Sequence, residues 1–265
     1  MSKMKDTHIT ASSASFFKDL KTVARRAIRL ASREPETIIP AIIIPLFFFI
    51  VNVGALSDIS NFAGVVDYKA FQLPVAIVFA VTGISRASSL VSDIQSGYFD
   101  RLLISPVSRH ALLLGLMVAD MLVVILLSIP VVILGLVLGV SFASGVLGML
   151  AFILLAAFWG LAFTGFPYAI ALKTGSSGAV NSSFLLFFPF AFLTTTFLPQ
   201  KALTGWLATV SAYNPVTYLL EGLRSLTTTG WVLADLLPAI AAIAAVGLLS
   251  QILAFRALKG RTARK

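Results

Sequence analysis

Residues 91–110 read VSDIQSGYFDRLLISPVSRH and form a long polar connection between two very apolar segments. The connection combines acidic and basic side chains, a glycine and a proline with a few aromatic and aliphatic side chains. Such a stretch is either a solvated linker or an element that docks a soluble partner. The apolar side chains favour docking, because a protein interface draws most of its energy from a few buried anchors.

The composition on either side of this connection places the chain in a lipid bilayer. Of 265 residues, 58% are hydrophobic and 12% are charged, and the mean hydropathy is +0.96. A soluble domain carries about 25% charged residues, and several apolar runs here approach the roughly 20 residues of a membrane span. The chain has no cysteine, which excludes disulfides and thiolate metal sites. The net charge of +9 is attributed to loops on one side of the membrane, and no nucleic-acid partner is expected.

The predicted fold class is an all-α membrane protein with six transmembrane helices. The predicted spans are 37–56, 70–91, 111–140, 145–172, 179–198 and 232–255. Residues 15–33 place apolar and basic side chains on different faces at helical spacing, which is typical of an amphipathic helix in the lipid headgroup layer. Residues 199–225 alternate short apolar stretches with proline and glycine breaks, which predicts re-entrant helices before the last span.

Lysine and arginine positions predict the orientation of the chain. Most of them lie before the first span, in the 91–110 connection and after the last span, whereas the opposite side holds only Lys69, Lys201 and Arg224. By the positive-inside rule, both termini and the 91–110 connection face the cytoplasm, and we expect a multi-pass protein of the plasma membrane. The predicted organisation is a mobile tail (1–14), a transmembrane domain (15–256) and a basic cytoplasmic tail (257–265).

Asp120 is the one acidic side chain deep inside a predicted span. It lies roughly 14 Å from Ala111 along the third helix, at 1.5 Å per residue. A charge at this depth is costly and has a partner in most proteins, and Arg86 is the nearest candidate by depth. The favoured interpretation is structural, with Asp120 locking two helices as half of an ion pair or as a neutral acid. The alternative is an ATP-independent secondary transporter or channel that uses Asp120 as a proton or substrate site.

Small polar and aromatic side chains are interleaved in the predicted fifth span. This pattern suits a path for an amphiphile, and it equally suits close packing of helices, so both interpretations stay open. The candidate path residues are Ser182, Ser183, Phe187, Thr194 and Thr195.

Two enzymatic interpretations fail on the sequence. No GxxxxGK[ST] pattern occurs, so the chain has no P-loop with which to hold ATP. Residues 175–178 read GSSG and match the GxSG pattern of a serine nucleophile, but neither His8 nor His110 lies inside a predicted span. Because a serine nucleophile needs a base within hydrogen-bond reach, a simple Gly/Ser turn is favoured over an intramembrane hydrolase. A membrane scaffold without a polar path is the remaining alternative.

Two stretches resemble the signature regions of ABC transporter permeases of the type-2 family. The first is SDIQSGYFDRLLISPVSRHALLLGLMVAD, where the family pattern falls on Asp93, Gly97, Asp100-Arg101-Leu102, Pro106-Val107-Ser108-Arg109 and Ala119-Asp120. The second is FLPQKALTGWLATVSAYNPVTYLLEGLR, where it falls on Pro199, Asn214-Pro215, Glu221 and Arg224. The resemblance extends from about Arg33 to the end of the sixth predicted span.

The resemblance implies a permease subunit of an ATP-driven exporter that moves an amphiphile (a drug, lipid or glycolipid) outward. It implies that residues 91–110 contain a coupling helix that docks a separate ATP-binding subunit, and that the chain pairs with a second permease, identical or paralogous. The chain itself is then expected to bind no metal or other cofactor, with ATP and Mg²⁺ on the ATP-binding subunit and membrane lipids around the spans. The implied contacts to that subunit are Asp93, Gly97, Tyr98, Phe99, Asp100, Arg101 and Leu102, and the implied extracellular re-entrant residues are Asn214, Pro215, Glu221 and Arg224.

Overall fold

The computed structural model describes residues 16–31, 35–60, 65, 67–82, 85–104 and 109–263. Within these ranges the regular elements are all helical, which confirms the predicted all-α class. The predicted mobile tail (1–14) and the Pro106 to Ser108 part of the first signature region lie outside the described residues. The described part of the predicted basic tail continues the last helix.

The helices follow one another in the order of the predicted segments. In chain order they are α1 (Phe16–Ala31), α2 (Pro35–Ser60), α3 (Tyr68–Thr82), α4 (Ala87–Gln95), α5 (Tyr98–Ile104), α6 (Arg109–Val137), α7 (Gly145–Thr174), α8 (Ser177–Ser182), the 3-10 helix η2 (Ser183–Leu186), α9 (Phe187–Phe192), the 3-10 helix η3 (Gln200–Ala202), α10 (Gly205–Tyr213), α11 (Pro215–Thr228) and α12 (Leu233–Ala263).

Five helical stretches of the described chain are long and apolar enough to cross a membrane: Ile39–Leu56, Tyr68–Gln95, His110–Val137, Gly145–Thr174 and Leu233–Arg261. They correspond to five of the six predicted spans. The predicted fifth span has a different form, because its apolar part is divided among α8, η2 and α9, and residues 193–198 are not helical. The count of six spans therefore stays a prediction.

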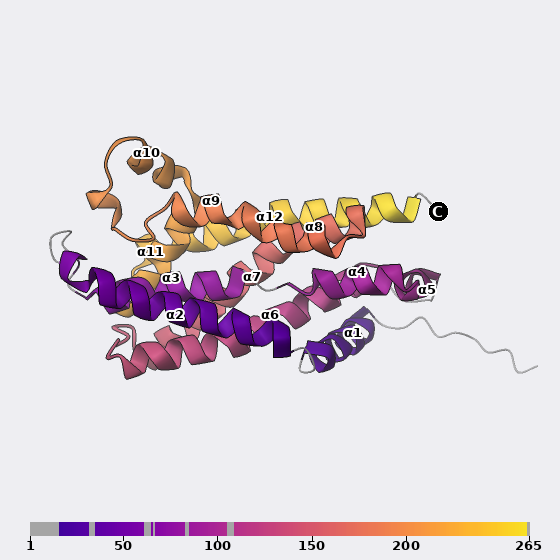
Figure 1. Cartoon of the computed structure of the whole chain (residues 1–265), viewed down its shortest axis with the longest axis horizontal. Helices are drawn as coiled ribbons and strands as arrows, with labels where there is room; N and C mark the ends of the chain where they lie inside the picture. The colour runs from indigo at the N-terminus through magenta and orange to yellow at the C-terminus, as the bar shows by residue number, and fades with distance from the viewer. Residues whose placement is uncertain are drawn as a thin grey trace, which may run out of the picture.

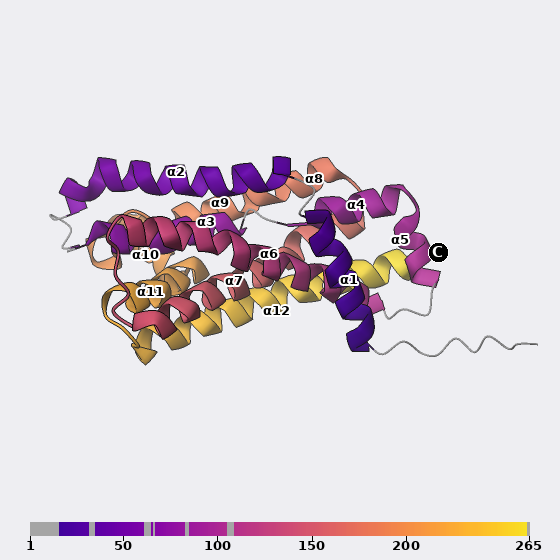
Figure 2. The same cartoon turned by 90° about the horizontal axis from the view of Figure 1, so that it is seen from below.

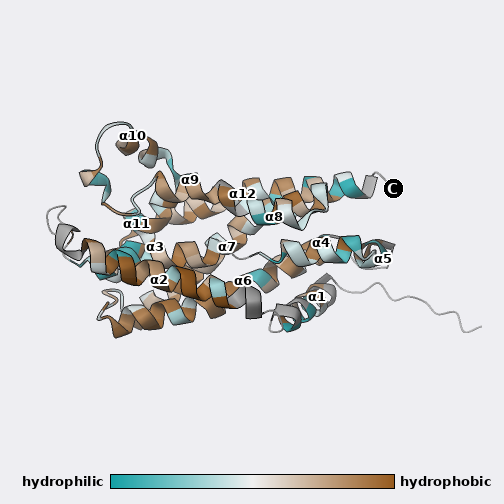
Figure 3. Ribbon diagram, viewed as in Figure 1, coloured by the Kyte–Doolittle hydropathy of each residue, from teal (hydrophilic) through white to brown (hydrophobic). Residues whose placement is uncertain are grey.

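The long helices lie side by side and give the molecule two distinct ends (Figure 1). One end holds α1, α4, α5 and the C-terminal part of α12, and the other holds α10 and α11. In the second view α1 runs across the direction of the long helices, which is the orientation of a helix lying along a membrane surface (Figure 2). Hydrophobic residues dominate the bundle between the ends, and hydrophilic residues gather on α1, α4 and the end of α12 (Figure 3).

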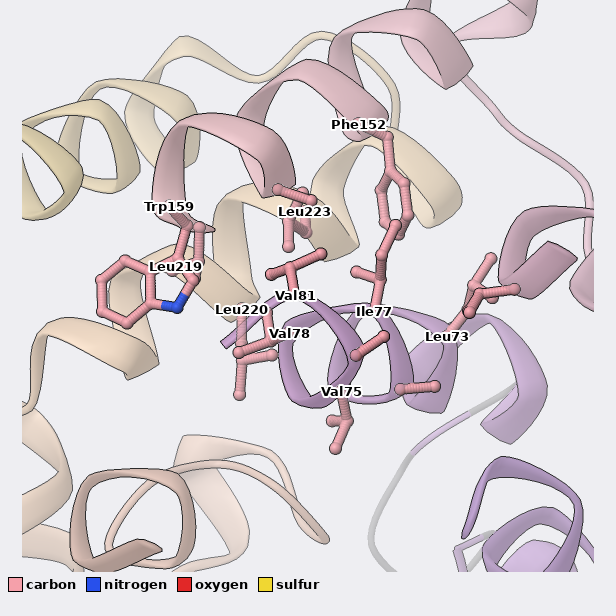
Figure 4. Close-up of a cluster of buried hydrophobic side chains, with 14 of the residues drawn as sticks. Leu73, Val75, Ile77, Val78, Val81, Phe152, Trp159, Leu219, Leu220 and Leu223 are labelled. Carbon is pink, nitrogen blue, oxygen red and sulfur yellow. The ribbon is translucent and has the colours of Figure 1, made fainter. Parts of the chain in front are cut away.

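The core is built around α3, which is buried along most of its length. In Figure 4, Ile77 and Val81 of α3 lie beside Phe152 of α7 and Leu223 of α11. Close helix contacts depend on glycine at several points, and a side chain at Gly165 of α7 would come within 2.5 Å of the α12 backbone. Small residues at such contacts are typical of helix packing in membranes, where close van der Waals contact replaces the hydrophobic driving force.

Candidate functional site

The stretch predicted to couple the chain to a soluble subunit forms a helix–turn–helix. Helix α4 ends at Gln95, and the N–H groups of Ser96 and Gly97 donate to carbonyls of its last turn. Gly97 adopts a φ of +72°, a left-handed conformation that strains residues with a side chain. Helix α5 begins at the next residue, and the Arg101 N–H donates to the Gly97 carbonyl. The signature glycine is therefore explained by the turn between α4 and α5.

The predicted contact residues of this stretch differ in exposure. Phe99 is only 4% exposed and belongs to a hydrophobic cluster that includes Ala24 of α1 and Leu90 of α4. Tyr98 is 37% exposed, and Arg101 is also exposed. Phe99 thus packs α5 against the other helices of the same chain. Gly97, Asp100 and Leu102 are half-buried, so Tyr98 and Arg101 are the most accessible members of the predicted set that follows Asp93.

Helix α1 contacts α4 through a bidentate ion pair. The Arg26 Nη1 and Nη2 atoms donate to the two carboxylate oxygens of Asp93 at 3.1 and 3.0 Å. The same guanidinium lies 4.3 Å from the centre of the Tyr98 ring. The hydrogen bonds to Asp93 raise the pKa of Arg26 above its ordinary value, so the cation persists at any physiological pH. The resemblance implies that Asp93 contacts the ATP-binding subunit. In the structure, Asp93 forms an ion pair with Arg26 of the same chain.

An exchange of these two charges tests the contact. The Arg26→Asp variant is expected to loosen α1 from α4 by about 0.5–1 kcal/mol, because the pair is partly exposed and partly screened. Hydrogen exchange of the α1 backbone amides would be faster in this variant, and the Arg26→Asp/Asp93→Arg double variant would restore most of the protection. The exposed neighbour Arg25, changed to Asp, is the matched control. Equal loosening in that control would mean that net charge of α1, and not the ion pair, holds the helix.

The second predicted span is interrupted where Asp120 meets it. Helix α3 ends at Thr82 and α4 begins at Ala87. Both Asp120 carboxylate oxygens accept from the Arg86 backbone N–H, at 3.2 and 3.3 Å, and the Tyr168 hydroxyl donates to Asp120 at 2.9 Å. Asp120 therefore caps the N-terminus of α4 from a different helix, where the partial positive charge of the helix end favours a carboxyl group.

The structure places Arg86 beside Asp120, and the contact is made by the Arg86 backbone N–H. The Arg86 guanidinium is buried and makes no hydrogen bond within the described part of the chain. Because α3 ends before Arg86, the backbone N–H of this residue is left free to meet the carboxylate. Tyr168 was not predicted as a partner. The available signal was a tyrosine inside a predicted span, since a phenol hydroxyl that is buried needs a hydrogen-bond partner. The arrangement joins α4, α6 and α7, and a purely structural role for Asp120 stays a prediction.

The non-helical residues 193–198 are held by side chains from other helices. The Thr194 and Thr217 hydroxyls lie 2.5 Å apart, and the Gln72 Nε2 donates to the Thr196 carbonyl at 3.0 Å. Irregular backbone at membrane depth is tolerated only where protein or water satisfies it. Thr194 and Thr195 are buried and bonded within the chain, so their place in a transport path stays a prediction.

Arg224 of α11 is the centre of these contacts. Its Nη2 donates to the Thr195 carbonyl at 2.6 Å and its Nη1 to the Thr195 hydroxyl at 2.8 Å and to Glu221 at 2.9 Å. Its Nε donates to the Phe71 carbonyl at 3.2 Å, and the guanidinium lies 3.5 Å from the centre of the Phe71 ring. One side chain thus joins α11, α3 and the irregular segment, with 4% of its residue surface exposed.

Asn214 and Pro215 begin α11 and fix its position. The Asn214 side-chain oxygen accepts from the Val216 N–H at 2.9 Å, and Pro215 occupies the first turn, where its missing N–H costs nothing. The Asn214 amide nitrogen donates to the carbonyls of Phe190 and Leu193 at 2.6 and 2.7 Å. Asn214 and Arg224 of the second signature region therefore both contact the segment that follows α9. Whether this end faces the outside of the cell stays a prediction.

A cavity of about 250 Å³ lies among α3, α7 and the α8–η2 segment. Its wall contains Thr82, Ser85, Phe163, Pro167, Val180, Asn181 and Ser183. Of the predicted path residues, only Ser183 contributes to it. Phe187 is buried in the core of the bundle, and Ser182 is exposed.

Comparison with known proteins places this arrangement in a family. Residues 18–227 match the ABC-2 type transporter family. The chain is 26% identical over 208 residues to a protein of Streptomyces coeruleorubidus named as a daunorubicin resistance ABC transporter permease, with 76% of this chain and 72% of the relative covered. It is 26% identical over 211 residues to a probable doxorubicin resistance ABC transporter permease of Mycobacterium tuberculosis strain H37Rv, covering 78% and 75%. The family match spans most of the chain and includes both signature regions. The chain is a multi-pass membrane permease and belongs to the ABC-2 type transporter family.

Proposed function

We propose that the chain is the transmembrane subunit of an ATP-driven exporter that moves an amphiphilic drug, lipid or glycolipid out of the cell. ATP and Mg²⁺ are held by a separate ATP-binding subunit, and the chain itself binds no cofactor. The names of the two relatives support an exporter of drug-like amphiphiles. The apolar surface of the long helices suits a substrate that enters from the membrane or its inner face.

The observation that carries this proposal is the position of α4 and α5. They form a helical hairpin at one end of the bundle, beside the basic helix α1 and the C-terminal end of α12 (Figure 1). The hairpin offers the exposed side chains of Tyr98 and Arg101, and Phe99 fixes it from within. An aromatic and an arginine side chain on a rigid base are the kind of residues that dominate protein interfaces. The basic end lies on the cytoplasmic side of the plasma membrane, where the ATP-binding subunit is located.

The contacts between helices suggest how force would pass from this hairpin into the bundle. A motion of α5 acts directly on α4, because Phe99 is packed beneath the turn. Asp120 holds the beginning of α4 beside α6 and α7. Helix α3 continues from there into the core and reaches Arg224 at the far end. In this proposal, closure of two ATP-binding subunits rocks two permease chains, either identical or paralogous, against each other.

The test is purification of the tagged chain from its native membranes, with transport measured afterwards in vesicles. We expect an ATP-binding subunit to co-purify in stoichiometric amount, and export of a probe such as daunorubicin to require ATP. The Asp120→Asn variant, which keeps a hydrogen-bond acceptor beside α4, is expected to retain most of this transport. Transport by the chain alone, lost in Asp120→Asn, would instead support an ATP-independent secondary transporter.

A further inference from the structure

The cavity among α3, α7 and α8 lies where regular α-helical hydrogen bonding is broken at three points. Helix α3 ends at Thr82, α7 contains Pro167, and α8 gives way to the 3-10 helix η2 at Ser183. All three of these residues belong to the cavity wall. Each interruption leaves polar groups that a continuous helix would have satisfied, and such groups persist at membrane depth only beside protein partners or a cavity that supplies them.

Two hydrogen-bonding groups of the wall, a hydroxyl and a side-chain amide, have donors available to a ligand. The Ser85 oxygen accepts from the Ala87 N–H at 3.2 Å, and the Asn181 side-chain oxygen accepts from the Ser88 hydroxyl at 3.1 Å. Neither the Ser85 hydroxyl nor the Asn181 amide nitrogen donates to any group in the described parts of the chain. A hydroxyl carries one such donor and a side-chain amide two.

The other two polar side chains of the wall are already engaged. The Thr82 hydroxyl donates to the Val78 carbonyl at 2.6 Å and accepts from the Trp159 indole at 3.0 Å. The Ser183 hydroxyl donates to the Val180 carbonyl at 2.5 Å. The available donors are therefore concentrated on Ser85 and Asn181, which come from different helical segments and belong to one wall.

An acceptor accompanies these donors. A proline has no N–H, so Pro167 cannot bond to the carbonyl of Phe163 four residues earlier, and that carbonyl has no α-helical partner. Both residues belong to the wall, and together with Val180 they supply its apolar part. The wall thus combines four polar side chains with an aromatic ring and two aliphatic side chains.

None of the described residues of the wall has an ionisable side chain. A charged ligand would enter without a counterion, at a large desolvation cost. Arg86 follows Ser85 in the chain but is not one of the residues of the wall. The cavity is larger than the roughly 150 Å³ that accommodates a benzene ring in an apolar protein interior. A ligand of one or two fused rings fits inside, and a longer one extends past Asn181, which is exposed.

We propose that this cavity binds an uncharged ring portion of the exported substrate, bearing hydroxyl or carbonyl groups that meet Ser85 and Asn181. This inference rests on the proposed exporter function and narrows its substrate class. A lipid chain has no groups for these donors, and a phosphate group finds no cation in the wall. The substrate part recognised here is therefore a neutral, oxygenated ring system.

The test is a binding measurement on the full chain in phosphatidylcholine nanodiscs, without nucleotide. The probe is quinizarin, a neutral fluorescent dihydroxyanthraquinone, and anthraquinone sulfonate is its charged counterpart on the same ring system. We expect saturable quinizarin binding above that of empty nanodiscs, and binding of the sulfonate weaker by ten-fold or more. The Asn181→Asp variant keeps the size of the side chain and removes its donor, so it is expected to weaken quinizarin binding about ten-fold.

A second variant blocks the cavity. Asn181→Trp places a large ring at its exposed side and is expected to weaken quinizarin binding by at least ten-fold. Leu185→Trp puts the same ring on the exposed side of η2, away from the wall, and is expected to bind as the natural chain does. Unchanged binding in Asn181→Trp, equal affinity for the sulfonate, or no saturable signal would each overturn the assignment. Co-purification of the ATP-binding subunit is independent of this result, so failure of the cavity and failure of the exporter proposal are distinguishable.

Discussion

A permease with Tyr98→Ala and Arg101→Glu together is expected to reach the membrane in normal amount and to lose at least nine-tenths of its ATP-driven transport. Both side chains are exposed on α5, so their replacement leaves the bundle intact. Truncating an interface anchor costs about 2 kcal/mol or more, and reversing a charge adds repulsion, so affinity for the ATP-binding subunit would fall by roughly a hundred-fold. Co-purification and ATP-dependent flux in vesicles measure the two consequences.

The matched control is Tyr213→Ala with Arg256→Glu. Tyr213 lies on α10 at the other end of the bundle and Arg256 on α12, and both are exposed. The control makes the same chemical changes and is expected to retain both the ATP-binding subunit and transport. Full transport by the Tyr98/Arg101 variant would remove α5 as the docking element. Loss of transport with the ATP-binding subunit still bound would place these residues after docking, in the transmission of force.

The helical class was predictable because a membrane helix is recognised from the length and apolar composition of one stretch of sequence. Its contacts with other helices need not be known. Five of the predicted spans are present as long apolar helices for this reason. The predicted fifth span departs from this form, because its backbone is completed by distant partners. Gln72 donates to the Thr196 carbonyl and Arg224 to the Thr195 carbonyl. These partners lie far away in the sequence, so no local pattern predicts the bonds.

The candidate sites divide in the same way. Gly97 was predictable from its place between two helical patterns, since a turn needs a residue free to adopt positive φ. The burial of Phe99 was not predictable, because the hydrophobic cluster to which it belongs draws residues from α1, α6, α7, α8 and α12 as well as α4. Arg86 was predictable as a neighbour of Asp120 from its depth, but the contact through its backbone N–H and the second partner Tyr168 were not. The cavity was not predictable, because its wall combines residues of helical segments that lie far apart in the sequence.

Replacing Arg224 by methionine is expected to destabilise the folded permease by about 3–5 kcal/mol, because each buried group left without a partner costs about 1–3 kcal/mol. Methionine keeps much of the apolar length of the side chain and removes every donor. The Thr195 and Phe71 carbonyls lose bonds of 2.6 and 3.2 Å, and Glu221 loses its cation. The apparent melting temperature in detergent would fall by roughly 10 °C.

Lysine at position 224 separates charge from geometry. An ammonium restores the positive charge beside Glu221 but cannot reach Thr195, Phe71 and Glu221 with the fork of a guanidinium, so Arg224→Lys is expected to recover less than half of the lost stability. The exposed Arg256, changed to methionine, controls for the loss of a charge and is expected to melt as the natural chain does. If Arg224→Lys melted normally, the charge alone would hold α11 to α3. If Arg224→Met melted normally, Asn214 and Gln72 would be sufficient to hold residues 193–198 in their conformation. The Arg224 contacts would then contribute little to keeping this end of the bundle closed.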